Sequence, residues 1–314
     1  MRPMLAPALA LSLAAPLAAQ EGGAFTLAET GQSFSTLDQA LEAAKPRGEF
    51  TWSTILIAPG RYRQCAVQSW GRTVFKARQP GTVVFEGTAC EGKAALVLRG
   101  RGAVVDGIVF RGIRVPDGNG AGIRSEIGDL TVKDSMFLDS QEGILGGVTG
   151  PQKIVIDHST FAGLGQCDET PDCAHSIYLA NQGQVTVTAS RFERGRGGHY
   201  VKLRVPKVEI SGNSFDDSQG AKTNYMIDLS EGATGSITGN AMVQGRNKEN
   251  WTAFISVAPE ARTYSSAGLR IEGNSARLSP GETRSPAFVA DASKQRLAIG
   301  ANTLGPGVRA YEAR

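Results

Sequence analysis

The sequence has little histidine, few aromatic residues and little net charge. Three histidines occur in 314 residues, and the four cysteines are not spaced like zinc ligands, so we expect no metal site of this kind. The formal net charge of +3 is too small to indicate binding to nucleic acid, so any electrostatic function must rest on local clusters. Beyond the N-terminal segment no stretch is apolar enough to span a bilayer. We therefore expect a soluble monomer with no nucleic-acid partner and no membrane insertion.

The first 19 residues have the pattern of a secretory signal peptide. Arg2 precedes an apolar run from Met4 to Leu17, and the small residues Ala18 and Ala19 follow. This pattern predicts cleavage after Ala19 and a periplasmic or extracellular location. A membrane anchor is the alternative, but the run is short and contains two prolines.

Four cysteines in an exported chain predict two disulfides. Cys167 and Cys173 bracket the short loop CDETPDC and form a natural local pair. Cys65 would then pair with Cys90. Three connectivities are formally allowed by four cysteines, and free thiols are the alternative.

Glycine is abundant, with 39 residues, which suits many short strands joined by turns. A pattern recurs along the chain: two apolar positions one residue apart, then a small polar residue, then another apolar residue. Clear copies are IVIDHSTF from residue 154, VTVTASRF from 185 and VEISGNSF from 208. The second apolar position of each copy recurs every 23 to 34 residues, at Val105, Val132, Ile156, Val187, Ile210, Ile237, Ile271 and Ile299. Phenylalanine usually stands five residues later.

This period predicts an all-β right-handed parallel β-helix, in which stacked coils bury a face that no coil can bury alone. A leucine-rich repeat would need closer leucines and a helical half in each repeat, and a β-sandwich would not keep the register. We expect a single domain over residues 20–314, with an N-terminal capping helix at about 34–45 and coils at about 53–305. Asparagine and serine at the bends should form hydrogen-bonded ladders.

The capping segment, followed by ILIAPGRY and the repeated coils, resembles right-handed parallel β-helix proteins of the pectate-lyase-like, polysaccharide-active superfamily. The resemblance covers most of the chain after residue 19. It implies the fold more than the activity, because lyases, hydrolases, epimerases and binding proteins share this architecture. In β-helix lyases the substrate carboxylate is neutralised by calcium or by lysine and arginine. No dense acidic cluster calls for calcium here, so we expect no required cofactor, with Ca²⁺ as the alternative.

Three successive coils carry the segments HSIYLA, HYVKLR and YMIDLS. If Ile177, Val201 and Ile227 point inward, the next residues point outward, in a column that reads Leu98, Arg124, Leu145, Tyr178, Lys202, Asp228, Ser256 and Ala290. Arg204 and Ser230 should lie beside this column, and Tyr200 should face the same outer side. His175, His199 and Tyr225 form a second column at the start of the strands. Strict alternation would turn that column inward, unless a bend such as GRGG exposes it.

This cluster suits a lyase that acts on an acidic, uronate-containing polysaccharide by β-elimination. Lys202 and Arg204 would neutralise the substrate carboxylate, His199 or Tyr178 would be the base, and Tyr225 or His175 the acid. Asp228 would orient a histidine or keep Lys202 charged, and Arg124, Tyr200 and Ser230 would contact substrate. The alternatives are a glycoside hydrolase that uses Asp228 with a second carboxylate, a uronate epimerase and a non-catalytic envelope glycan-binding protein. A surface ladder of salt bridges without a functional role is the simplest alternative.

Overall fold

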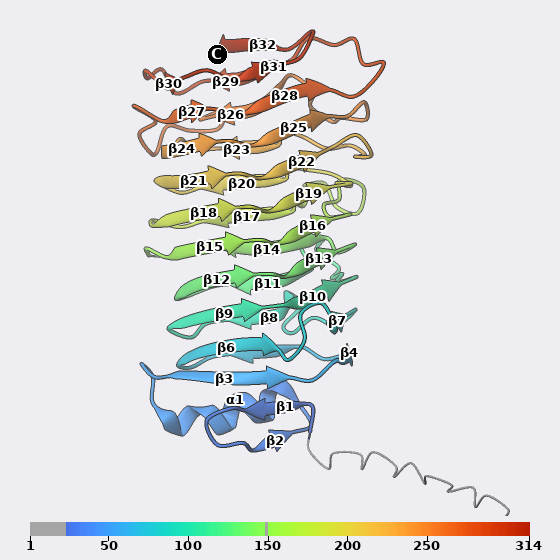
Figure 1. The fold of residues 1–314 in the computed structure, drawn as a ribbon, viewed down its shortest axis with the longest axis vertical. Helices are drawn as coiled ribbons and strands as arrows, with labels where there is room; N and C mark the ends of the chain where they lie inside the picture. Colours follow the sequence, from blue (N-terminus) through green and yellow to red (C-terminus); the bar gives the residue numbers. More distant parts are fainter. Residues whose placement is uncertain (1–22, 148–149) are drawn as a thin grey trace, which may run out of the picture.

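The computed structural model describes residues 23–147 and 150–314, so the expected signal peptide lies outside the described residues. The chain winds in stacked coils, and each full coil adds one strand to each of three sheets that run along the molecule (Figure 1). Sheet A has 12 strands, and sheets B and C have 10 each. Apart from the N-terminal strands β1 and β2, the strands pair in parallel. The molecule is therefore a parallel β-helix, which confirms the predicted all-β fold.

The strands of each sheet follow one another at intervals of one coil. Sheet A contains β1 (Phe25–Leu27), β2 (Ser33–Phe34), β3 (Trp52–Ile57), β6 (Arg72–Ala77), β9 (Gly102–Asp106), β12 (Asp129–Lys133), β15 (Lys153–Asp157), β18 (Gln184–Thr188), β21 (Lys207–Ser211), β24 (Thr234–Thr238), β27 (Arg270–Glu272) and β30 (Ala298–Ile299). Sheet B contains β4 (Gly60–Tyr62), β7 (Val83–Glu86), β10 (Ile108–Arg111), β13 (Met136–Leu138), β16 (Thr160–Ala162), β19 (Arg191–Glu193), β22 (Ser214–Asp216), β25 (Ala241–Gln244), β28 (Ser275–Leu278) and β31 (Thr303–Leu304). Sheet C contains β5 (Ala66–Gln68), β8 (Ala94–Leu98), β11 (Ala121–Ser125), β14 (Glu142–Gly147), β17 (Ile177–Ala180), β20 (Val201–Arg204), β23 (Ile227–Leu229), β26 (Ala253–Val257), β29 (Ala287–Asp291) and β32 (Arg309–Ala313).

The helix α1 (Leu37–Ala44) lies at the N-terminal end of the stack, where the prediction places it (Figure 1). Thr36 begins the helix with a capping box, since its hydroxyl accepts from the Gln39 amide and the Gln39 side chain accepts from the Thr36 amide. The buried face of α1 packs on the first strands through Leu37, Ala40 and Leu41. A short 3₁₀ turn, η1 (Lys45–Arg47), follows it. In the part of the chain that the structure describes, no helix is long and apolar enough to cross a membrane.

The predicted register of the repeat is confirmed from Val105 to Ile299, because each marker residue pairs with its counterpart in the next coil. Five residues after the markers, phenylalanine rings stack inside the coils, with centroids 4.9 Å apart for Phe161 and Phe192. The predicted asparagine ladder is also present. The side-chain amide of Asn240 donates to the oxygen of Asn274 at 2.9 Å. Stacking of like residues therefore fills the core and satisfies the buried polar groups of the bends.

Both predicted disulfides are present, Cys65–Cys90 and Cys167–Cys173. Disulfides persist in oxidising compartments, so this pair of bridges is consistent with a protein that works outside the cytoplasm.

Candidate active site

A cleft with a volume of about 560 Å³ lies over the corner at which the chain enters sheet C. Its lining residues belong to six successive strands of that sheet, β11 to β26, or to the corners before them. Stacked strands are about 4.8 Å apart, so these coils extend roughly 24 Å along the axis, enough for an extended polymer. The lining residues are Asn119, Glu142, Pro171, Asp172, Cys173, His175, Tyr178, Gly198, His199, Lys202, Arg204, Asn224 and Glu249.

Two consecutive residues point inward at this corner, and this decides which side chains reach the cleft. Tyr200 and Val201 both belong to the hydrophobic core. The residues on either side of them, His199 and Lys202, line the cleft. The preceding coil follows the same pattern and places His175 in the cleft. The bend therefore turns both histidines toward the cleft, although each stays largely buried, whereas strict alternation would have placed them in the core.

The same corner overturns the expectation that Tyr200 faces substrate. Its side chain is 1% exposed, and its hydroxyl donates to Asp217 at 2.8 Å. Asp217 also pairs with the buried Lys248 at 3.1 Å and accepts from the hydroxyl of Thr223 at 2.8 Å. Tyr200 therefore belongs to a buried polar network beneath the corner and does not reach the cleft.

The two predicted cations lie side by side on β20 and share one carboxylate. Lys202 Nζ is 2.7 Å from Oε1 of Glu260, and a guanidinium nitrogen of Arg204 donates to the other oxygen. Arg204 also donates to the hydroxyl of Tyr178, and both cations lie over the Tyr178 ring, 5.5 and 5.2 Å from its centroid. Glu260 reaches this pair from the turn after β26. The cleft thus contains a carboxylate-binding site next to a phenol.

The two histidines form a buried pair beside Asp228. The backbone amide of His199 donates to Nδ1 of His175 at 3.0 Å, and the two Nδ1 atoms are 3.4 Å apart. A neutral His175 whose Nδ1 accepts this bond carries its proton on Nε2. On the other side, Nε2 of His199 is 3.4 Å from Oδ2 of Asp228, which also accepts from Ser230 at 2.9 Å. Asp228 therefore contacts His199 and Ser230 from behind the cleft, as an orienting residue would.

Burial controls the charges of this group. Burial, followed by the charges of Lys202 and Arg204, lowers the pKa of His175 to about 3, and burial also lowers the pKa of His199 well below its usual value. Burial raises the pKa of Asp228 to about 6, against the opposing effect of Lys202. Both histidines are consequently neutral near pH 7 and add no charge to the two cations.

Glu142 is a carboxyl group of the cleft to which sequence reasoning gave no role. It begins β14 and is 1% exposed, and its Oε2 has no hydrogen-bond partner among the residues that the structure describes. Burial raises the pKa of Glu142 well above its usual value, although the His175 backbone and the charge of Arg124 oppose the shift. The shift favours the protonated form of Glu142, which can donate one hydrogen bond.

Three other predicted residues do not line the cleft. The Tyr225 hydroxyl instead accepts from Asn250 at 2.8 Å and from Arg314 at 3.0 Å. Ser230 is fully buried and donates to Asp228. Arg124 lies on β11 in the predicted outward column, and its influence on the site is the charge it places near Glu142. The proposed contacts of Arg124 and Ser230 with substrate, and of Tyr225 as an acid, find no support in this placement.

The outward column is correct from Arg124 to Ala290 and wrong by one residue at its start. Arg124 pairs with Val97, whereas Leu98 pairs with Ser125. The segment AALVL is apolar throughout, so its pattern does not distinguish the two faces.

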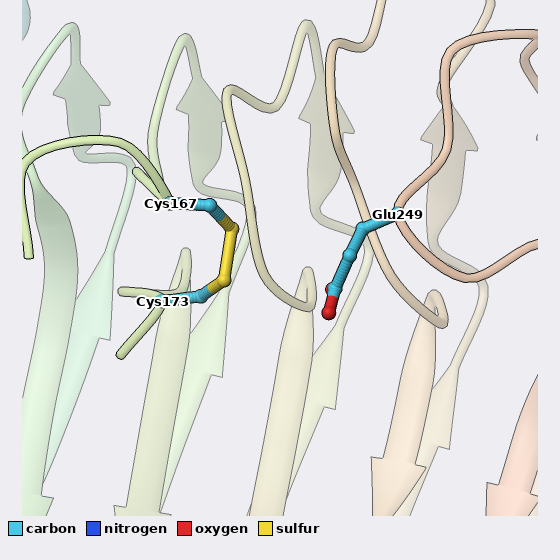
Figure 2. A group of neighbouring side chains, drawn as sticks. All are labelled: Cys167, Cys173 and Glu249. Atoms are coloured by element: carbon cyan, nitrogen blue, oxygen red, sulfur yellow. A yellow bond between two sulfur atoms is a disulfide. The ribbon is translucent and has the colours of Figure 1, made fainter. Parts of the chain in front are cut away.

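The Cys167–Cys173 loop forms one wall of the cleft through its residues 171–173. Figure 2 shows the disulfide with the carboxylate of Glu249 beside it, from a later coil. Ligand atoms of these three residues lie within 4.8 Å of one another. Both sulfurs are bonded to each other and cannot be thiolate ligands, so this group does not fit a zinc ion. The loop is therefore better suited to shaping the cleft than to holding a metal.

Sequence reasoning missed Glu260, Asn224, Asn119 and Glu249. All four lie in turns or corners outside the repeated pattern, so no periodicity identifies them. The side-chain amide of Asn224 donates a hydrogen bond to the carboxylate of Glu249 at 2.7 Å, although the two residues are 25 positions apart in the sequence. Only the stacking of coils brings such residues together.

No protein-family model matches the sequence, and no curated protein matches it either. Among solved structures, the chain is similar to an alginate lyase from Paenibacillus sp. str. FPU-7, with a TM-score of 0.66 and 12% identity over 88% of this chain and 95% of that one. It is also similar to ORF18 of Geobacillus virus E2, with a TM-score of 0.51 and 12% identity over 87% of this chain and 56% of that one. At this identity the likeness shows the parallel β-helix fold, which polysaccharide lyases share, and not the activity.

Proposed function

We propose that this protein is an exported polysaccharide lyase that cleaves an acidic, uronate-containing glycan by β-elimination. The observation that carries the proposal is the pair Lys202 and Arg204, which together hold a carboxylate beside the hydroxyl of Tyr178 in a cleft long enough for a polymer. The likeness in fold to an alginate lyase supports the class of reaction and places alginate among the first substrates to test.

In this scheme the substrate carboxylate binds between Lys202 and Arg204. Neutralising that carboxylate stabilises the negative charge that develops when the proton leaves the neighbouring C5 carbon. Tyr178, as the phenolate, removes this proton, and Arg204 stabilises the phenolate through the hydrogen bond that it donates to the oxygen. The C4–oxygen bond breaks as the C4–C5 double bond forms, and the leaving oxygen takes the proton back from Tyr178.

The neutral histidines position the sugar in this scheme. With Nδ1 engaged by the His199 amide, His175 presents an Nε2–H donor. Glu142 in its acid form offers a second donor in the same cleft. His199 is held by Asp228 and is assigned an orienting role rather than that of the base.

A glycoside hydrolase is the second candidate, because Glu142 is a carboxylic acid suited to protonating a leaving group. Asp228, its expected partner, does not line the cleft and keeps its oxygens buried against Ser230 and His199. A hydrolase would therefore need Glu249 or Asp172 as its second carboxylate.

The test is a screen of the mature protein against alginate, polygalacturonate and glucuronate-containing polysaccharides, with and without calcium and with a chelator. Ultraviolet absorbance of an unsaturated uronate in the products would establish elimination, and its response to the chelator would settle the calcium requirement. Shorter chains without this absorbance would establish hydrolysis. A change of sugar configuration without cleavage would establish epimerisation, and binding without turnover would leave a glycan-binding protein.

A further inference from the structure

The two cations of the cleft, Lys202 and Arg204, both bind a carboxylate of the protein itself. Glu260 offers one oxygen to Lys202, at 2.7 Å, and the other to Arg204. One carboxylate oxygen on each of two cations is also the arrangement expected for a bound uronate carboxylate. Glu260 thus occupies the position that the substrate needs.

The main chain of Glu260 is fixed, while its side chain is accessible to solvent. The amide of Glu260 donates to the carbonyl of Ser230 at 3.0 Å, and the amide of Ala261 donates to the same carbonyl at 3.2 Å. Pro259, which precedes Glu260, restricts the turn further. The Glu260 side chain is 40% exposed, whereas that of Lys202 is 11% exposed. Rotation of one side chain would therefore vacate the cations without moving the backbone.

Each cation keeps another carboxylate nearby when Glu260 leaves. Nζ of Lys202 is 4.0 Å from Asp228, and Nε of Arg204 is 3.5 Å from Glu231. Glu260 is consequently not needed to hold either cation in place. Its exchange for a substrate carboxylate leaves the charge balance of the site unchanged, whereas its exchange for a neutral sugar leaves a charge uncompensated.

We infer that Glu260 is an internal stand-in for the substrate carboxylate, which masks the Lys202–Arg204 subsite in the free protein and is displaced when an acidic sugar binds. Glu260 is therefore a specificity-determining residue. It lowers the affinity for every ligand by competing for the cations, and it penalises neutral glycans most. This inference rests on the proposed function, because it takes the ligand of the subsite to be a uronate.

The test is calorimetric titration in a Tyr178→Phe background, which prevents turnover. The probes are saturated trisaccharides of mannuronate, guluronate and galacturonate. Removal of the competing charge by Glu260→Gln should tighten binding of the preferred trisaccharide about fivefold to tenfold at low salt, and the gain should shrink as salt is added. The matched control is Glu231→Gln, which removes a carboxylate beside the same Arg204 without freeing Lys202, and its gain should be clearly smaller.

The possible results separate the inference from the proposed function. A gain in affinity in Glu260→Gln that exceeds the gain in Glu231→Gln supports the masking role of Glu260. If Glu260→Gln binds no more tightly than the Tyr178→Phe background, and that background binds the trisaccharide, the masking role of Glu260 is overturned. Glu260 is then a positioning residue, and the proposed function stands. Failure of every variant to bind any of the three trisaccharides overturns the masking role of Glu260 and the proposed function together.

Discussion

Tyr178 combines a hydroxyl in the cleft with two cations over its ring. Burial raises the pKa of Tyr178, while the charge of Arg204 lowers it. The phenol is therefore protonated in the free protein near pH 7, and a base role requires the minority phenolate.

Tyr178→Phe should abolish elimination, by about 10²- to 10⁴-fold or more, and should leave trisaccharide binding within a small factor. In the unaltered protein kcat/KM should rise with pH on the alkaline side, because the base must be ionised. The measurement is a pH–rate profile by product absorbance, with Tyr264→Phe as a control that removes a hydroxyl outside the cleft. A profile that falls as the pH rises through this range would assign the proton transfer to another group.

Asp228 should make stability depend on pH. Its pKa in the folded protein is about 6, raised by burial from the ordinary 3.8. The folded state thus binds this proton more tightly than the unfolded state, so the stabilisation is complete below about pH 4 and is lost as the pH rises through about 6. The shift corresponds to about 3 kcal/mol.

The asparagine of Asp228→Asn cannot ionise, so this variant should not lose stability in this way as the pH rises. Urea unfolding at several pH values should show the variant gaining about 3 kcal/mol relative to the unaltered protein between about pH 4 and pH 7. Asp168→Asn, which alters an exposed carboxylate in the disulfide loop, should follow the unaltered protein at each pH. Identical pH slopes for Asp228→Asn and the unaltered protein would contradict the raised pKa.

Among the elements of the fold, the corner before the strands of sheet C determines the site. Alternation is a property of a regular strand, and the inward pair Tyr200 and Val201 interrupts it one residue before β20 begins. Gly197 and Gly198 precede this corner with φ values of 156° and 58°. A side-chain Cβ at Gly198 would lie 2.1 Å from the Ala174 carbonyl oxygen, so this position requires glycine.

The two disulfides should differ in what they support. Cys167–Cys173 closes a short loop that walls the cleft, whereas Cys65–Cys90 joins residues 25 positions apart, away from the cleft. In the chain-entropy model their removal costs about 2 and about 3.5 kcal/mol, respectively. Replacing Cys167 and Cys173 by alanine should therefore raise KM several-fold with a modest loss of stability.

The matched control replaces Cys65 and Cys90 by alanine. That variant should lose more stability and keep its KM, as measured by thermal unfolding and by product absorbance on the same samples. If both variants showed the same change in KM, the loop 167–173 would have no particular role in substrate binding.

At the scale of the whole molecule, stability comes from contacts between neighbouring coils. Phe161 is fully buried and stacks on Phe137 at 4.8 Å and on Phe192 at 4.9 Å. A parallel β-helix behaves nearly as a one-dimensional stack, so a defect in the middle weakens two interfaces at once.

Phe161→Ala should destabilise the protein by about 3 to 5 kcal/mol, because it leaves a cavity and interrupts the ring stack. The measurement is urea unfolding at a fixed pH near 7. Phe50→Ala provides the control, since Phe50 is 66% exposed and its loss should change stability by no more than about 0.5 kcal/mol. Similar losses in the two variants would show that the ring stack contributes little.

The sequence by itself determined the stacked fold, the strand register from Val105 onward, the capping helix and the column Tyr178, Lys202 and Asp228, and it favoured one of the three cysteine pairings. The fold, the register and the column follow from period and alternation, which each coil repeats and which can be counted along the chain. The helix and the favoured cysteine pair follow instead from local sequence signals. Tertiary structure alone decided that Tyr200 is buried and that Tyr225 turns toward Arg314. It also brought Glu260 across to Lys202, 58 positions away in the sequence. Turns and corners carry no period, so the neighbours of their side chains are fixed only when one coil is placed on the next.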